Sequence, residues 1–231
     1  MISRFGVVAA ALAVGSGVAS AQVGRTPETS PYRDLEYKQE WTLFGGYFNA
    51  RHDIAGAGPQ GGPIEGARWA IRLGGPAYFT TRVGTSFQDR TVINPQLDDP
   101  ERRATQEQLP LLYADAGFDF QLTGFKSWHS IAPFISGGIG LTVDTKGKAD
   151  IADFSFGSPF TMTFGAGFKW IPGGRWNLRF DWSNYLYRLH YPESYYIKSG
   201  PGEPVLAEDV KKDFWRRNNV YTVGLTLLTF R

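Results

Sequence analysis

One stretch of seventeen residues, 154–170, constrains the fold of this chain more than any other. It reads Phe-Ser-Phe-Gly-Ser-Pro-Phe-Thr-Met-Thr-Phe-Gly-Ala-Gly-Phe-Lys-Trp, so bulky apolar residues alternate with small or polar ones. A period of two places alternate side chains on opposite faces of a β-strand. At roughly 3.3 Å per residue and a tilt near 45°, such a strand would reach about 40 Å along a membrane normal. We therefore expect a membrane-crossing strand; the alternative is a long strand of a secreted β-sandwich or lipocalin-like barrel.

The amino-terminal region predicts export from the cytoplasm. Residues 1–21 have the form of a secretory signal peptide, with Arg4 before a run of small apolar residues and an Ala-Ser-Ala cleavage motif at its end. Residues 22–39 are polar and proline-containing, so we expect a flexible periplasmic lead-in without packed structure. The third segment, residues 40–231, is assigned to one β-domain.

Strand-like and loop-like segments alternate along that domain. Eight strands are predicted, at residues 41–49, 67–73, 78–91, 111–122, 130–144, 154–170, 175–187 and 218–230. The seven connections alternate between long and short, which is typical of an up-and-down barrel with loops at one end and turns at the other. The predicted fold class is therefore all-β, an eight-stranded antiparallel up-and-down transmembrane β-barrel.

The two faces of these strands differ in charge. The charged strand positions all share a face with glycine, serine or threonine; they are Arg68, Arg72, Arg82, Asp115, Asp119, Lys169, Arg179 and Asp181. An eight-stranded barrel is only wide enough for side chains to fill its interior, so we predict that these eight residues form an interior charge network. Arg82 is expected to pair with Asp115 or Asp119, and Lys169 with Asp181. The opposite faces of five predicted strands carry no charge, which suits contact with lipid.

Tryptophans lie on the apolar faces of the predicted strands. Four of them, Trp69, Trp170, Trp176 and Trp182, are predicted to lie at the membrane interface. Trp170 and Trp176 flank the Gly173-Gly174 turn, where an aromatic girdle is expected. For each tryptophan taken singly, a position in the core of a soluble sheet is the alternative.

In this predicted architecture, residues 41–230 resemble the small outer-membrane β-barrel proteins of Gram-negative bacteria, the OmpA/OmpX-like group. The last strand resembles the assembly signal of that family, with apolar residues alternating up to Leu227 and Phe230 near the end. It departs from the pattern because Arg231 follows and because Phe230 is out of phase with the alternation. The resemblance implies location in the outer membrane, with outer-membrane lipid and the barrel-assembly machinery as partners.

Several kinds of chemistry are excluded or disfavoured by the residues present. The chain has no cysteine and a net charge of only +2, which excludes thiolate sites and gives no electrostatic case for nucleic acid. The three histidines, His52, His129 and His190, show no metal-ligand spacing. His129 and Ser130 are adjacent and would point to opposite faces of a strand, unlike the catalytic pair of barrel-shaped lipid A deacylases. We therefore expect no catalysis, no metal and no cofactor.

The sequence favours a structural or surface-interaction role for a barrel with a closed lumen. An extracellular ligand at the long loops fits that role. Two other functions remain open, a narrow pore for transport and a secreted lipocalin-like carrier of a small apolar ligand.

Overall fold

The protein was analysed as a computed structural model, which describes residues 30–98, 100–103, 105–198 and 203–230. The predicted signal peptide therefore lies outside the described residues, as does Arg231. The strands are β1 (Tyr32–Asp34), β2 (Gln39–Asn49), β3 (Gly62–Gly74), β4 (Ala77–Val92), β5 (Thr105–Gln121), β6 (Lys126–Trp128), β7 (Ile131–Asp144), β8 (Phe160–Gly173), β9 (Trp176–His190) and β10 (Asp213–Thr229). Two single-turn 3-10 helices, Glu101–Arg103 and Glu193–Tyr195, lie in connections.

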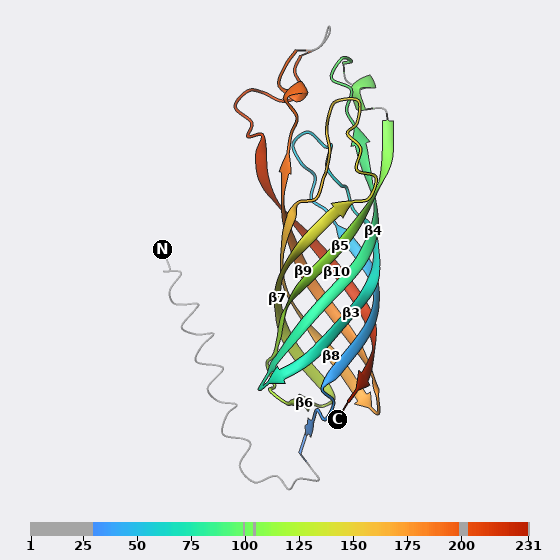
Figure 1. Ribbon diagram of the computed structural model, residues 1–231, viewed down its shortest axis with the longest axis vertical. Coiled ribbons are helices and arrows are strands. Elements are labelled where there is room, and N and C mark those ends of the chain that lie inside the picture. The colour runs from blue at the N-terminus through green and yellow to red at the C-terminus, as the bar shows by residue number, and fades with distance from the viewer. Residues whose placement is uncertain (1–29, 99, 104, 199–202, 231) are drawn as a thin grey trace, which may run out of the picture.

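The eight long strands form a closed antiparallel ring (Figure 1). Each pairs with its neighbours in the order β2, β3, β4, β5, β7, β8, β9, β10, and β10 returns to β2 over eleven residue pairs from Asn219↔Asn49 to Thr229↔Gln39. Closure satisfies both edges of every strand, so no open sheet edge remains in the ring. The predicted fold class is confirmed.

The two ends of the barrel differ, as the alternating connections predicted. Short turns join β3 to β4 and β8 to β9, while the four long connections rise together at the opposite end (Figure 1). We call these the turn end and the loop end. The short strands β1 and β6 pair with each other at the turn end, with Tyr32 opposite Trp128. The prediction that the lead-in has no packed structure is therefore wrong for Tyr32–Asp34.

The opening strand is shorter than its alternation suggested. β8 begins at Phe160, and residues 154–159 belong to a loop. Asp153 and Gly157 have φ angles of 62° and 67°, which turn the chain out of the extended conformation. Phe154 and Phe156 are buried against other loops and lumen residues instead of facing lipid, so a run of alternating aromatic residues need not lie on one strand.

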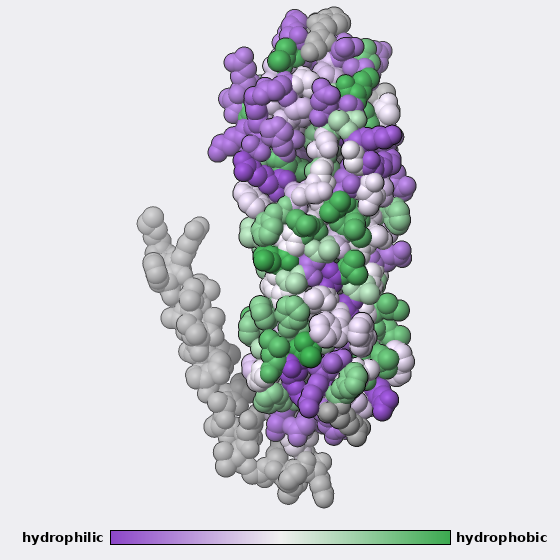
Figure 2. All heavy atoms as spheres, viewed as in Figure 1, coloured by the Kyte–Doolittle hydropathy of each residue, from purple (hydrophilic) through white to green (hydrophobic). Residues whose placement is uncertain are grey.

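The outward face of the ring is apolar over most of its height. Large exposed side chains occur on all eight strands, among them Leu43, Leu73, Val83, Phe118, Ile135, Phe164, Trp182 and Leu225. Figure 2 shows hydrophobic side chains gathered over the strands and hydrophilic ones over the loop end. Because several strands extend further toward the loops than predicted, their outward faces also carry Glu65, Arg188 and Arg217 there. Asp89, inside the predicted strand 78–91, is also exposed on the outward face, so the prediction that every charged strand position faces inward is wrong there. No helix in the described part of the chain is long and apolar enough to cross a membrane.

Candidate functional site

The centre of the lumen is an ion-pair cluster around Arg179 of β9. Its Nε and Nη2 donate to the two carboxylate oxygens of Asp181, both at 2.8 Å, and its Nη1 donates to Asp119 Oδ2 at 2.8 Å. Arg68 of β3 donates from Nη1 to Asp119 Oδ2 at 3.2 Å and lies 3.5 Å from Asp181 Oδ1. Two guanidinium groups and two carboxylates from three strands thus form one neutral cluster, with Arg179 stacked over the ring of Phe134. Asp119 is fully buried and Arg179 is 1 % exposed.

Arg82 and Asp115 form a separate bidentate pair on adjacent strands. Arg82 Nε donates to Asp115 Oδ2 at 2.9 Å and Nη2 donates to Oδ1 at 3.2 Å. The two residues lie directly opposite each other in the β4–β5 register. Of the two partners predicted for Arg82, the structure selects Asp115, because Asp119 lies opposite Tyr78 and is engaged by Arg179 and Arg68.

Lys169 does not pair with Asp181 as predicted. Its Nζ lies 2.7 Å from both carboxylate oxygens of Glu40, and 4.4 Å from the centre of the Tyr78 ring. The error arose at Glu40, which the sequence reading placed just before the first strand. β2 begins at Gln39, so Glu40 faces the lumen and supplies the missing carboxylate. Glu40 lies two residues before Thr42 and four before Phe44, so the two-residue period of the strand could have placed it on the same inward face.

Arg72 lies apart from the network at the turn end. Its Nη1 donates to the carbonyl oxygen of Leu35 at 2.6 Å, and its guanidinium lies 5.6 Å from the ring of Phe125. The structure therefore brings seven of the eight predicted charged residues into lumen ion pairs and gives Arg72 a different contact.

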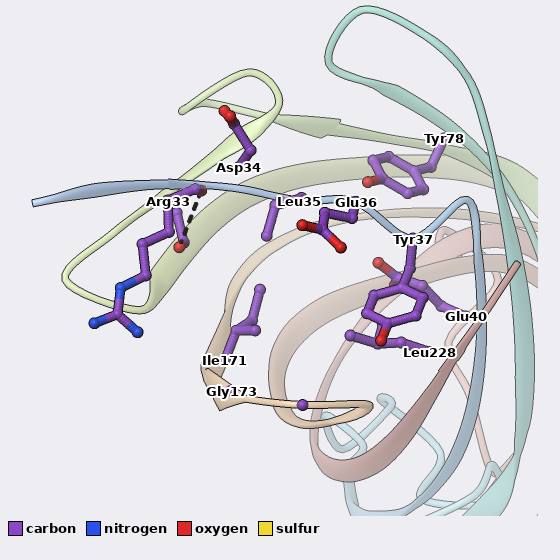
Figure 3. Close-up of a pocket in the computed structure, with 12 residues that line it drawn as sticks. Arg33, Asp34, Leu35, Glu36, Tyr37, Glu40, Tyr78, Ile171, Gly173 and Leu228 are labelled. Carbon is purple, nitrogen blue, oxygen red and sulfur yellow. Dashed lines mark hydrogen bonds between the residues drawn. The ribbon is translucent and has the colours of Figure 1, made fainter. Parts of the chain in front are cut away.

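The contact with Leu35 holds an extended segment, residues 31–38, across the turn end. We call it the N-terminal strap. The backbone amides of Leu35 and Lys38 in the strap donate hydrogen bonds to the rim of the barrel, and the amide of His129 on the rim donates one to the strap. Between the strap and the barrel lies a cavity of about 250 Å³, with Leu35, Glu36 and Tyr37 on one side and Ile171 and Leu228 on the other (Figure 3).

Glycines on the inward face make room for aromatic rings. A Cβ atom on Gly66 would lie 2.7 Å from Cζ of Phe44, and one on Gly167 would lie 2.5 Å from Cζ of Phe134. These two glycines thus leave space for the Phe44 and Phe134 rings, and the Phe134 ring lies against the Arg179 guanidinium.

Above the ion pairs the lumen is filled by aromatic side chains. Tyr113 stacks on Phe48 with ring centres 5.4 Å apart and meets Tyr185 edge-on at 5.4 Å. Gln88 donates to the Tyr113 hydroxyl at 2.7 Å. The guanidinium of Arg82 lies 5.0 Å from the Tyr185 ring, so the charged and aromatic layers are in direct contact.

A second group of ion pairs, which the sequence reading missed, joins the strands to the loops. Arg216 of β10 donates to Asp53 of the first loop at 2.9 Å, and the Tyr191 hydroxyl donates to the same carboxylate at 2.7 Å. Arg90 of β4 donates to Asp150 of the third loop at 2.9 Å. No periodic signal marks the loop members of these pairs, because they do not lie on strands.

The four loops share a small apolar core, which we call the loop cap. It comprises Ala55, Ala57, Ile93, Ala152, Phe154, Tyr191, Tyr195 and Leu206. Phe154 and Tyr195 stack with their ring planes 6° apart. Burial raises the pKa of the Tyr195 and Tyr191 hydroxyls well above the ordinary value of 10. The cap therefore favours neutral tyrosines.

The predicted interfacial tryptophans all lie on the outward face, but at two levels. Trp170 and Trp176 flank the β8–β9 turn and are 44 % and 52 % exposed. Trp69 is half-buried beside Trp41, with ring centres 6.1 Å apart. Trp182 lies six residues further along β9, opposite Tyr221 of β10, and so nearer the loop end.

The residues considered for catalysis are not assembled into a site. His129 and Ser130 occupy left-handed positions in the turn before β7, with φ angles of 47° and 66°. Among the described residues, no group of three histidine, aspartate or glutamate side chains is placed to hold a metal ion.

Comparisons with known proteins agree with this architecture. No protein-family model and no curated protein matches the sequence. Among solved structures, the chain is similar to Neisserial surface protein A, with 11% identity and a TM-score of 0.50 over 87% of this chain and 98% of that one. It is also similar to the outer membrane protein OprG from Pseudomonas aeruginosa, with 10% identity and a TM-score of 0.52 over 86% of this chain and all of the other. At these identities the likeness establishes the fold, and it confirms the resemblance to small outer-membrane β-barrel proteins.

Proposed function

We propose that this chain is an integral protein of the bacterial outer membrane with a closed lumen and a structural or surface-interaction role, without catalysis. The observation that carries the proposal is that the wall of the barrel is charged on its inner face and apolar on its outer face. The strands that bury Arg179, Asp119 and Lys169 inside expose Trp182, Phe118 and Phe168, respectively, outside. In water, so extensive an exposed apolar belt would drive association, whereas in a bilayer it is the stable arrangement.

The proposal of a closed lumen rests on how the interior is filled. Lys169 and Asp119 have no exposed surface, and every carboxylate at their level lies against a cation. Removing a neutralised ion pair from water is costly, and satisfied geometry offsets that cost. A continuous water path would leave these side chains partly exposed.

A surface role is supported by the loop cap. The first and third loops are tied to the strands through buried ion pairs, and all four loops share the apolar core, so they present an ordered surface. Each loop also exposes a large aliphatic side chain, namely Ile54, Leu97, Ile151 and Ile197. Exposed aliphatic groups on an ordered surface are suited to contact with an extracellular ligand.

Export and assembly complete the proposal. The predicted signal peptide, residues 1–21, would direct the chain across the inner membrane, and the predicted assembly signal in the last strand would engage the barrel-assembly machinery. Outer-membrane lipid then surrounds the apolar belt. Outer-membrane barrels have short turns on the periplasmic side and long loops on the extracellular side, so the turn end would face the periplasm and the loop end would face outward.

The absence of cysteine permits a direct test of insertion and orientation. Leu97→Cys places a single thiol on a loop, and Lys126→Cys places one at the exposed start of β6, at the turn end. A membrane-impermeant maleimide applied to intact cells should label the first variant only, and lysed cells should label both.

The same cells should yield the protein in the outer-membrane fraction, with a gel mobility that changes on heating, as folded barrels show. Labelling of the turn variant but not the loop variant would reverse the orientation. Recovery of a folded protein in the soluble fraction without detergent would favour the lipocalin-like carrier.

A further inference from the structure

Near the loop end, the outward face of β9 and β10 changes from apolar to cationic. Arg188 and His190 of β9 and Arg217 of β10 are exposed there, beside Asp213. We call these four residues the arginine patch. Elsewhere at this end, the outward positions of β3 and β4 carry the carboxylates Glu65 and Asp89, so the positive charge lies on one side of the barrel.

The register places the two arginines within reach of one ligand. Arg188 lies directly opposite Trp215, and Arg217 lies directly opposite Leu186. The arginines are therefore diagonal neighbours on one face, with Cα atoms about 7–8 Å apart. Their long side chains can converge on a single group from that separation.

One of the two arginines is held in position. Arg217 Nε donates to Asn184 Oδ1 at 2.5 Å, and its guanidinium lies 5.8 Å from the Phe164 ring. These contacts use Nε alone, and neither Nη group has a partner among the described residues. The Arg217 fork is thus fixed while its two outer nitrogen atoms stay available, which is the arrangement that favours bidentate binding of an oxyanion.

Asn184, which accepts the hydrogen bond from Arg217, is itself buried. It lies on the outward face of β9 but has no exposed surface, because Arg217 and its other neighbours cover it. Its Nδ2 is buried and has no hydrogen-bond partner in the part of the chain that the structure describes. A buried donor without an acceptor costs roughly 1–3 kcal/mol.

Apolar side chains flank the patch. A shallow groove runs past Arg188, lined by Pro159, Phe160, Leu189 and Trp215. Toward the turn end, the face continues with Phe164, Trp182 and Tyr221, all large and exposed. An anionic group at the patch would therefore be continuous with hydrocarbon lying along the strands.

We propose that the arginine patch binds the phosphate of a phosphorylated glycolipid in the outer leaflet, with the acyl chains packed along β8, β9 and β10. This inference rests on the proposed location in the outer membrane. The net positive charge of the patch favours an anionic ligand, because two guanidinium groups face only one carboxylate, Asp213. That carboxylate lies 3.1 Å from Arg188 Nη2 and 3.2 Å from His190 Nδ1. The patch is thus cationic even with His190 neutral, and the nearby Lys212 is neutralised by Glu193.

The test is retention of lipid by the purified full-length barrel in a neutral detergent, followed by native mass spectrometry. The probes are bisphosphorylated lipid A and the same lipid after phosphatase treatment. The wild-type protein should retain the phosphorylated probe at least tenfold more strongly than the dephosphorylated one. The double variant Arg188→Gln, Arg217→Gln should lose that preference. Arg175→Gln, an exposed arginine at the turn end, is the matched control and should bind as the wild type does.

The outcomes separate the two proposals. A double variant that folds, shows heat-modifiable mobility and still prefers the phosphorylated probe would overturn the lipid site and leave the outer-membrane proposal standing. A stable dimer abolished by the double variant would also overturn it, since the patch would then meet Glu65 and Asp89 of a second copy. A wild-type protein that never enters the outer-membrane fraction would overturn the proposed function itself.

Discussion

The lumen and the loop cap of this barrel are stabilised by different kinds of contact. In the lumen, Arg179 and Asp119 are held by ion pairs between side chains on rigid neighbouring strands. In the cap, Phe154 and Tyr195 are held by apolar contact between loops. The closed wall of strands determines which residues face inward, so charges can be matched across it. The loops have no such frame and need an apolar core of their own. We therefore expect loss of a lumen contact to weaken the whole barrel and loss of a cap contact to act locally.

The largest effect is expected from Asp119→Ala. The change removes the carboxylate shared by Arg179 and Arg68 and leaves Asp181 alone to neutralise both. Breaking a buried pair in this way costs about 3–5 kcal/mol of unfolding free energy. Urea titrations of the barrel refolded into lipid vesicles measure it.

The control is Asp34→Ala, which removes an exposed carboxylate 3.8 Å from Lys126 and should cost about 1 kcal/mol or less. A double variant, Asp119→Ala with Arg68→Met, should lose less stability than the sum of its single changes. Simple additivity would mean that the lumen charges act independently, contrary to the cluster described.

A charge on the outer wall should have the next largest effect. Ile135→Arg places a cation on the apolar belt, where its cost is about 2–4 kcal/mol near the bilayer midplane. Gln108→Arg, outward on β5 near the loop end, should cost only about 0–1 kcal/mol. Vesicle refolding titrations compare the two, and equal costs would remove the evidence that the belt lies in lipid.

In the cap, Phe154→Ala should loosen the loops without unfolding the barrel. Removing the ring takes away its stacking partner from Tyr195 and the surface over which Arg90 lies at 5.4 Å. We expect at least tenfold faster proteolysis within the loops and a change of less than about 1 kcal/mol in barrel unfolding, because loops open locally. Ile151→Ala, at an exposed position of the same loop, should change neither quantity. A loss of barrel stability as large as that of Asp119→Ala would contradict the distinction between the two regions.

The smallest effect concerns alkaline pH. Because burial favours the neutral tyrosines, the stability that they give the cap is present below the ordinary pKa of 10 and falls as pH rises through the raised values. Ultraviolet titration should show that Tyr195→Phe removes an ionisation centred well above pH 10. Loss of an ionisation at or below pH 10 would mean that Tyr195 is not buried.

Periodicity predicted the wall of the barrel and much of its interior, because both follow from residues on strands. It assigned Arg82 correctly to a neighbouring-strand carboxylate and placed Arg68, Arg179 and Asp181 on the inward face. It failed where strand ends were misplaced. Glu40 was left outside the first strand, and Phe154 was counted as lipid-facing although it is a cap residue.

The cap could not have been predicted from any local pattern. Its contacts join residues from loops far apart in the sequence, such as Asp53 with Tyr191, and only the closed ring brings these loops together. Outward Arg217 was hidden for a related reason, since the last predicted strand began only at residue 218.

The conductance of the wild-type barrel in a planar lipid bilayer tests the central claim most directly. If the ion pairs of the lumen and the strap at the turn end close the barrel, no steady open-channel current should be seen for the wild-type protein. Asp119→Ala should introduce at most brief openings. A steady wild-type current that scales with salt concentration would show a continuous water path through the lumen, and the structural role would give way to transport.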